Sequence, residues 1–258
     1  MDYRKELEVA KKAAVVAGAA ILEIYGEDDF HVEYKADASP ITEADKRANG
    51  IIVDLLREKF PDYAILAEES EDDDSRHGND FCFVVDPLDG TKEFIKRNGQ
   101  FTVNIALAYK HKAVMGVIYI PVTKELYFAI EGEGSYYQPE NADPVRIRVS
   151  DRTSDIRLMV SLSHSDDRIE GLIERNHVAN VIKMGSSIKG CLIARGESEA
   201  YYRFGPTMEW DTAAMQCIVE QAGAVFRQTD GSEMLYNREN PVNAMGFYIL
   251  NKLENALG

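Results

Sequence analysis

The 258-residue chain is long enough for one large domain or two compact ones, and its 45% hydrophobic and 28% charged residues are typical of a soluble globular protein. Its formal net charge of −15 argues against binding to a nucleic-acid polymer, which requires a basic surface. The same charge means that any anionic substrate needs local cations at its binding site.

The N-terminal sequence and the pattern of cysteines lead us to expect a protein of a reducing compartment. No segment reaches the about 18 consecutive apolar residues of a membrane-spanning helix, and the N-terminal stretch lacks the order of a signal peptide. We therefore expect a cytoplasmic protein without an integral membrane segment, which leaves peripheral membrane association open. The three cysteines show no CxxC spacing and are expected to be buried thiols: Cys82, Cys191 and Cys217.

The first half of the chain predicts two helices followed by a sheet. Apolar residues recur at helical spacing over residues 3–25, and a short strand is expected over 30–36. A second helix is expected over 43–59, and the acidic stretch 68–80 is expected to be a solvated loop because like charges repel. A strand is expected over 63–69, and a largely antiparallel sheet should be formed by strands over 81–86, 101–109, 113–121 and 125–137.

The second half predicts a smaller α/β unit. A change of composition over 139–154 indicates a boundary between an N-terminal half, residues 1–150, and a C-terminal half, residues 151–258. Strands then alternate with helices expected near 169–175, 187–195 and 210–222, and a strand pair ends the chain. No low-complexity linker separates the halves, so we expect a tight interface between them.

Acidic residues stand where strands are predicted to end or helices to begin. In "FCFVVDPLDGTKEF" an apolar run leads directly to two carboxylates. Burying a carboxylate costs on the order of several kcal/mol unless it is paired. Each acid alone has an ordinary explanation, such as a favourable helix dipole or a turn in "DPLDG". Together they predict a site for a hard cation: Asp45, Glu68, Asp86, Asp89 and Asp211.

Oxygen ligands without histidine or cysteine favour Mg²⁺, Mn²⁺ or Ca²⁺ over zinc. We infer that Mg²⁺ pairs with Asp86 and Asp89, and two such ions would suit phosphoryl hydrolysis. Gly90 and Thr91 stand at a predicted helix start, where backbone amides bind phosphate. A threonine hydroxyl bonded to a glutamate would also orient an attacking water.

Three motifs carry a family resemblance. "AEES", "DPLDGT" and "WDTAA", in this order, resemble the motifs of the lithium-sensitive, magnesium-dependent phosphatases of the inositol monophosphatase superfamily, and the similarity runs through nearly the whole chain. The resemblance implies an α+β or α/β fold, a layered α/β/α/β/α sandwich. It also implies two or three Mg²⁺ ions, with Mn²⁺ as a substitute, and direct attack of water on phosphorus without a phosphoenzyme.

Residue roles follow from the same resemblance. The first metal would be held by Glu68, Asp86 and the Leu88 carbonyl, and the second by Asp86, Asp89 and Asp211. Asp45 would belong to a weaker third metal or water site, and Thr91 with Glu68 would activate the attacking water.

The second half resembles the 3′(2′),5′-bisphosphate nucleotidases of bacterial sulfate assimilation, through "SLSHSDD", "MGSSIKG" and "YYRFGPTMEWDTAA". This implies removal of the 3′-phosphate of adenosine 3′,5′-bisphosphate, giving AMP, with the 3′-phosphosulfate analogue as a further substrate. Independently, Lys189 and Arg203 are the kind of cation pair that a second phosphate would need. The resemblance implies these substrate contacts: Gly90, Thr91, His164, Ser186, Lys189, Arg203 and Asp211.

Several alternatives stay open at this point. Lys189 could be solvated, Arg203 could pair with Glu199, His164 could be a plain hydrogen-bonding histidine, and "GSS" could only cap a helix. The metal motifs are equally compatible with an inositol monophosphatase, a fructose bisphosphatase or another sugar-phosphate phosphatase. A third hypothesis is a non-catalytic nucleotide-binding protein on the same fold. The sequence gives no oligomeric state and does not choose a base-stacking aromatic among Tyr201, Tyr202 and Phe204.

Overall fold

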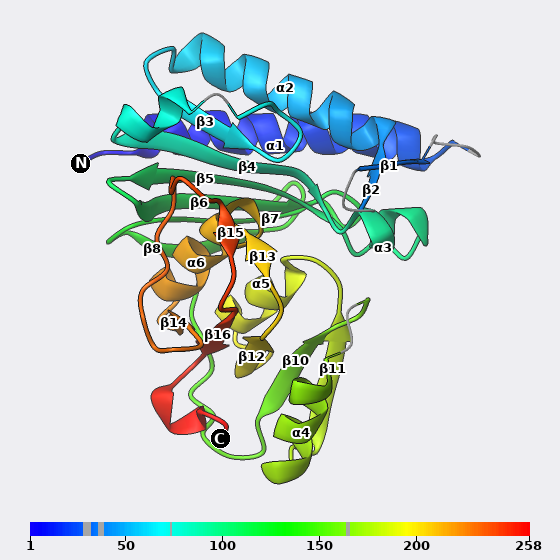
Figure 1. Cartoon of the computed structure of the whole chain (residues 1–258), viewed down its shortest axis with the longest axis vertical. Coiled ribbons are helices and arrows are strands. Elements are labelled where there is room, and N and C mark those ends of the chain that lie inside the picture. Colours follow the sequence, from blue (N-terminus) through cyan, green and yellow to red (C-terminus); the bar gives the residue numbers. More distant parts are fainter. Residues whose placement is uncertain (28–31, 36–38, 73, 164–165) are drawn as a thin grey trace.

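The computed structural model describes residues 1–27, 32–35, 39–72, 74–163 and 166–258. Its helices and sheets form five layers (Figure 1): a helix pair, a seven-stranded sheet, a second helix pair, a five-stranded sheet and a last helix. Three hydrophobic clusters fill the spaces between successive layers. The expected α/β/α/β/α sandwich is confirmed.

The outer helix pair is formed by α1 (Arg4–Tyr25) and α2 (Glu43–Lys59). The apolar positions of α1 are buried at helical spacing, from Leu7 to Ile24. A capping box between Thr42 and Asp45 satisfies backbone amides at the start of α2. Both predicted helices are confirmed, and α2 has the predicted bounds.

The seven strands of the first sheet follow one another in chain order, with β3 parallel to β4 and all later neighbours antiparallel. Alternate residues of the strand at 81–89 face opposite layers: Phe83 and Val85 pack toward α1 and α2, whereas Cys82 and Val84 face the inner helices. The strands are β3 (Ala64–Ala67), β4 (Phe81–Asp89), β5 (Thr102–Tyr109), β6 (Lys112–Ile120), β7 (Glu125–Ile130), β8 (Gly134–Gln138) and β9 (Val145–Ile147).

Three details of the first half differ from the sequence predictions. The single strand expected over 125–137 is a hairpin, because Gly132 (φ +80°) turns the chain between β7 and β8. The strand β9 lies within the stretch where the boundary was expected, so the first sheet extends into it, and the division at residue 150 stays a prediction. The acidic stretch is not wholly solvated, since it contains the short helix η1 (Ser75–Gly78) with Arg76 buried.

The expected strand at 30–36 is only partly described: β1 (Val32–Tyr34) pairs with β2 (Pro40–Thr42) in a small antiparallel sheet. Residues 30, 31 and 36 lie outside the described residues.

The second sheet has the strand order β11-β10-β12-β16-β14, in which β10 is parallel to both β11 and β12. The three helices predicted for this half are confirmed, with ends within two residues of those predicted. Its strands are β10 (Arg157–Ser161), β11 (Asn180–Met184), β12 (Ala200–Arg203), β14 (Val225–Gln228) and β16 (Phe247–Leu250), beside the small pair β13 (Thr207–Met208) and β15 (Val242–Asn243). The helices are α4 (Asp167–Arg175), α5 (Ile188–Ala194), α6 (Glu209–Gln221) and η2 (Leu253–Asn255).

Helices α5 and α6 form the middle layer and join the two halves. Although α6 belongs to the second half of the chain, it packs against β4, β5, β6 and β7 of the first sheet. It therefore brings the start of its first turn to the end of β4, where the predicted acidic residues lie (Figure 1). All three cysteines are buried free thiols among the described residues, as predicted. No helix in the described ranges is long and apolar enough to cross a membrane.

Gly116 on β6 marks the closest approach of α6 to the first sheet. A Cβ atom at this position would lie 2.5 Å from the backbone oxygen of Ala214, which cannot move without shifting the helix. We expect Gly116→Ala to lower the free energy of unfolding by about 1–3 kcal/mol, measured by urea denaturation. Gly50→Ala in α2 is the matched control, because nothing lies within 4 Å of its Cβ and alanine favours the helix. Equal stability of both variants would contradict this packing.

Candidate active site

One cavity of about 500 Å³ opens between the first sheet, α5, α6 and the end of β12. Most of the site residues predicted from the sequence line it: Glu68, Asp86, Leu88, Asp89, Gly90, Thr91, Ser186, Lys189, Arg203 and Asp211. Asp45 lies behind this wall and contacts Thr91. His164, also predicted, lies outside the described residues.

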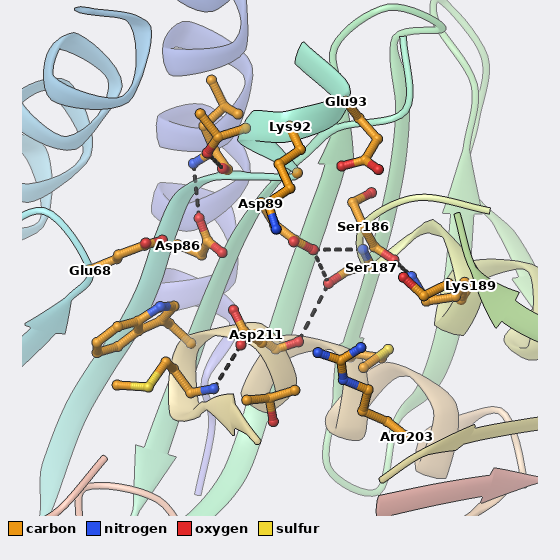
Figure 2. A pocket seen from close by; sticks show the side chains of 18 of the residues that line it. Glu68, Asp86, Asp89, Lys92, Glu93, Ser186, Ser187, Lys189, Arg203 and Asp211 are labelled. Carbon is orange, nitrogen blue, oxygen red and sulfur yellow. Dashed lines mark hydrogen bonds between the residues drawn. The ribbon is translucent and has the colours of Figure 1, made fainter. Parts of the chain in front are cut away.

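An irregularity in β4 explains how two carboxylates of one strand reach the same cavity. Residues three apart on a regular strand face opposite sides of the sheet. The pairing of β4 with β5 shifts register between Asp86 and Asp89, and Pro87 stands between them without an amide donor. The amide of Leu88 donates to Asp86 Oδ1 at 3.0 Å and fixes that side chain. Figure 2 shows both carboxylates directed into the cavity.

The third member of the cluster comes from the second half of the chain. Asp211 stands in the first turn of α6, and its Oδ2 accepts a hydrogen bond from the Met208 amide at 2.7 Å. Carboxylate oxygens of Asp86, Asp89 and Asp211 lie within 4.8 Å of one another. Glu68, which directly follows β3, points toward Asp86 from the other side (Figure 2).

The electrostatics of this cluster favour a bound cation. Burial, reinforced by Glu68, Asp89 and Asp211, raises the pKa of Asp86 well above its ordinary value. Burial is also the main cause that raises the pKa of Glu68 to about 7, and burial with the charge of Asp89 raises the pKa of Asp211 to about 8. Several oxygen donors that repel one another in a buried space are the ligand set of a hard divalent cation, so the residues present fit such an ion.

Lys35 was not predicted from the sequence to belong to the site. Its ammonium donates to Glu68 Oε1 at 2.8 Å and to Glu69 Oε1 at 2.5 Å. This contact joins the small β1–β2 sheet to the end of β3. The charge of Lys35 offsets part of the negative charge at the edge of the carboxylate cluster.

Ser187 was not predicted either: its neighbour Ser186 was predicted as a substrate contact, and a helix cap was the alternative left open for "GSS". The structure gives Ser187 no side-chain capping bond at the start of α5. Instead, its amide and its hydroxyl donate to Asp89 Oδ2 at 2.6 and 2.7 Å, and Asn104 Nδ2 donates to the hydroxyl at 2.9 Å. Ser187 therefore holds Asp89 in place from across the cavity. Ser187 stands in the quoted motif "MGSSIKG", but nothing in that motif indicates Asp89, which lies 98 residues away in the sequence.

The hydroxyl of Thr91 has a different partner from the one predicted. We expected it to bond to a glutamate, but it donates to Asp45 Oδ1 at 3.1 Å, with a longer contact of 3.4 Å to the Leu88 carbonyl. The other oxygen of Asp45 is held by the amide and hydroxyl of Thr42 at 2.7 and 2.5 Å. The capping box of α2 thus leaves one oxygen of Asp45 directed at α3 (Thr91–Ile95). Burial raises the pKa of Asp45 to about 6.

Lys189 is buried rather than solvated, so the alternative of a solvated helix face is wrong. Its side chain is buried in α5, and its ammonium donates to the carbonyls of Ser186 and Met184 at 2.5 and 3.3 Å. The ammonium also lies 5.2 Å from the centroid of the Tyr201 ring. Burial lowers the pKa of Lys189 to about 8, although Asp89 opposes this shift.

Arg203 ends β12 and reaches into the cavity near Asp211 and Ser187 (Figure 2). The alternative that it pairs with Glu199 is wrong, because Glu199 binds Arg157 at 2.6 Å. The Nε atom of Arg203 is buried and has no hydrogen-bond partner within the described part of the chain. A buried donor of this kind calls for an acceptor from a ligand or water.

Comparisons with known proteins agree with this geometry. The model of the inositol monophosphatase family matches residues 2–255. The chain belongs to the inositol monophosphatase family. Members of this family are metal-dependent, and this member has a cluster of three acidic residues that could bind a metal ion.

Curated relatives within the family carry a more specific name. The chain is 40% identical, over 92% of its length and 96% of the relative's, to "3′(2′),5′-bisphosphate nucleotidase CysQ" of Salmonella typhimurium. It is 37% identical, over 95% and 94% of the two lengths, to the protein of the same name in Buchnera aphidicola. Among solved structures, CysQ from Bacteroides thetaiotaomicron has a TM-score of 0.84 at 39% identity, covering 97% of this chain and 98% of that one.

Proposed function

We propose that this inositol monophosphatase family member is a divalent-metal-dependent phosphatase that hydrolyses the 3′-phosphate of adenosine 3′,5′-bisphosphate to AMP and phosphate, with the 3′-phosphosulfate analogue as a further substrate. The observation that carries the proposal is one cavity with a buried carboxylate cluster at one wall and two basic side chains, Lys189 and Arg203, at another. The name of relatives that are 40% identical over most of the chain supports it.

Two divalent cations, Mg²⁺ or Mn²⁺, would be held by Asp86, Asp89, Asp211, Glu68 and the Leu88 carbonyl, with a weaker third ion near Asp45. Bound there, such ions neutralise the carboxylates and the developing charge on the phosphoryl oxygens. The backbone amides of Gly90 and Thr91 would bind the phosphate oxygens. A side chain at Gly90 would strain the turn that presents these amides, since its φ is +97° and a Cβ would lie 3.0 Å from the Gln100 carbonyl.

The water that attacks phosphorus would be oriented by Thr91. Its hydroxyl oxygen can accept a proton from water while its own proton passes to Asp45 Oδ1, which already accepts that hydrogen bond at 3.1 Å. A pKa of about 6 leaves Asp45 largely ionised at neutral pH and ready to take this proton. Glu68 would hold the water from the opposite side. The leaving group is the 3′-oxygen of the ribose, and no covalent enzyme intermediate forms.

The second phosphate distinguishes this substrate from a sugar monophosphate. In our proposal Lys189, Arg203 and Ser186 bind this second phosphate. The two cations make this part of the cavity positive, although the chain as a whole is negative. The N-terminal half, residues 1–150, would then supply most metal ligands, and the C-terminal half, residues 151–258, the substrate contacts and Asp211.

Lys189→Ala should impair the bisphosphate more than a monophosphate. Loss of a charged hydrogen bond to the second phosphate should raise KM for adenosine 3′,5′-bisphosphate by about tenfold or more. KM for adenosine 3′-monophosphate, which lacks that phosphate, should rise much less. Lys124→Ala is the matched control, because Lys124 is exposed and pairs with Glu140 far from the cavity. Equal rises for both substrates would show that Lys189 does not bind the second phosphate.

The proposed function is tested by phosphate release in the presence of Mg²⁺, comparing adenosine 3′,5′-bisphosphate with inositol 1-phosphate, each with and without EDTA. We expect a preference for the nucleotide by orders of magnitude and loss of activity with EDTA. Preference for inositol 1-phosphate would overturn the substrate assignment and keep the metal site. Tight nucleotide binding without turnover would favour a binding protein.

A further inference from the structure

Glu93 is a buried acid that stands outside the carboxylate cluster. It lies in the first turn of α3, is only 4% exposed, and lines the same cavity as the cluster. Its carboxylate has no hydrogen-bond or ion-pair partner among the residues that the structure describes. A buried carboxylate without a partner destabilises the protein, so Glu93 calls for a donor from outside the chain.

The neighbouring backbone directs the side chain of Glu93 into the cavity. A Cβ atom at Gly185 would lie 2.7 Å from Cγ of Glu93 and 2.9 Å from the backbone oxygen of Gln100. The glycine therefore leaves room for the glutamate stem between α3 and the turn that precedes α5. Figure 2 shows the carboxylate directed toward Ser186, on the side of the cavity where Lys189 lies.

Neither Lys189 nor the carboxylate cluster accounts for this acid. The ammonium of Lys189 donates to the Ser186 carbonyl at 2.5 Å, and it forms no ion pair with Glu93 in the described part of the chain. Among the described residues, the acids that lie close enough together to hold a cation are Asp86, Asp89 and Asp211. The donor that Glu93 needs therefore has to come from the substrate.

The proposed substrate offers such a donor at this place. A carboxylate only accepts hydrogen bonds, and the ribose of adenosine 3′,5′-bisphosphate carries its free hydroxyl on the carbon next to the 3′-phosphate. In our proposal the amides of Gly90 and Thr91 bind that phosphate, and Glu93 follows Thr91 by two residues on the same helix. Lys189 and Ser186 bind the second phosphate, so the sugar between the two phosphates passes in front of Glu93.

We propose that Glu93 accepts a hydrogen bond from the 2′-hydroxyl of the substrate and thereby selects ribonucleotides over 2′-deoxyribonucleotides. The inference rests on the proposed function, because it concerns the sugar of that substrate. A hydrogen bond from a hydroxyl to a buried carboxylate is stronger than one between neutral groups. When the hydroxyl is missing, the carboxylate stays buried without a donor, so the site rejects the deoxy analogue.

Glu93→Met and Glu93→Gln test this contact. Methionine has a similar length and fills the same space beside Gly185, but its thioether is only a weak acceptor. Glutamine keeps a carbonyl oxygen that can accept the hydroxyl. Glu58→Met is the matched control, because the side chain of Glu58 is 66% exposed on α2 and does not line the cavity. The substrates are adenosine 3′,5′-bisphosphate and its 2′-deoxy analogue, which lacks only this hydroxyl.

We expect the wild type to have a kcat/KM for the ribonucleotide at least about tenfold above that for the deoxy analogue. Glu93→Met should abolish most of this preference, Glu93→Gln should keep most of it, and Glu58→Met should keep all of it. Calorimetric dissociation constants of AMP and 2′-deoxy-AMP should change in the same way, which reports on the hydroxyl contact without turnover.

A purely structural role of Glu93 would lower kcat/KM for both substrates by the same factor in Glu93→Met and leave their ratio as in the wild type. That result, or a wild type without preference for the ribonucleotide, would overturn the inference about Glu93 while the proposed function stands. A wild type that hydrolyses inositol 1-phosphate but neither nucleotide would instead overturn the proposed function, and the inference with it.

Discussion

Asp86→Asn is expected to lower kcat for phosphate release by at least about a thousandfold while the protein stays folded. Asparagine has the same shape and keeps an oxygen to accept the Leu88 amide, which now donates to Asp86 Oδ1 at 3.0 Å. It removes the charge that stands between Glu68 on one side and Asp89 and Asp211 on the other. In our proposal Asp86 would help to hold both metal ions, so no other residue can replace it.

The measurement is kcat at saturating Mg²⁺ and substrate, together with thermal unfolding of the same samples. Asp80→Asn is the matched control: Asp80 directly precedes β4, its side chain is 61% exposed, and among the described residues that side chain makes only a 3.8 Å ion pair with Lys110. This control should keep wild-type turnover. A folded Asp86→Asn variant with near wild-type turnover would refute the two-metal assignment.

Local patterns in the sequence were sufficient to predict much of this site. The helix α2 was predicted with its observed bounds because the pattern of residues 43–59 and Pro61 just beyond its end lie within one short stretch. The acids of "DPLDGT" were predicted for the same reason, since an apolar strand leads directly to them. The cavity then brings together ten of the predicted positions from several elements.

The features that sequence reasoning missed depend on contacts between distant residues. Thr91 bonds to Asp45 across 46 residues, Ser187 to Asp89 across 98, and Lys35 to Glu68 across 33. None of these side chains differs from an ordinary polar residue until the fold places its partner beside it. The hairpin at Gly132 was missed although the sequence carries a signal for it: the glycines of "EGEG" lie between the two strands and are typical of a short turn.

The middle layer shows why the two halves must be considered together. The start of α6 contributes Asp211 to a cluster whose other members end β4, and Gly116 allows α6 to approach the first sheet closely enough for that contact. The chain therefore assembles its carboxylates only when both halves have folded and packed. Ionised carboxylates that repel one another in this cluster destabilise the folded state unless cations bind. Because protonation removes these charges, the stability of the cation-free protein depends on pH.

The free energy of unfolding of the cation-free protein is expected to fall between about pH 4 and pH 8, in total by on the order of several kcal/mol. Folding raises the pKa of Asp45 to about 6, of Glu68 to about 7 and of Asp211 to about 8, from ordinary values of 3.8, 4.5 and 3.8. Within this window the folded protein holds protons that the unfolded chain has already released. Stability is therefore fully present at the acid end and is lost as the pH rises through the folded pKa values.

Burial also raises the pKa values of Glu209 and Glu220, which act in the same direction, whereas groups whose pKa is lowered by an arginine act outside this window. Carboxylates paired with arginine, such as Asp72 and Asp166, have lowered pKa values and lose their contribution only as the pH falls below their ordinary range. Lys189, with a pKa of about 8, contributes with the opposite sign, and mainly above pH 8. The change in the free energy of unfolding between about pH 4 and pH 8 therefore comes mainly from the buried carboxylates.

Urea unfolding at pH 5, 6, 7 and 8, in EDTA and in Mg²⁺, measures this dependence. We expect the downward slope in EDTA and a much smaller one in Mg²⁺, because a divalent cation binds the ionised carboxylates of the folded protein and replaces their protons. Asp86→Asn should flatten the slope in EDTA, because folding raises the pKa of the buried Asp86 carboxyl and the amide that replaces it does not titrate. A cation-free protein that becomes more stable from pH 5 to pH 8 would show that the carboxylates are compensated by groups within the fold, and the argument for a bound cation would lose its electrostatic basis.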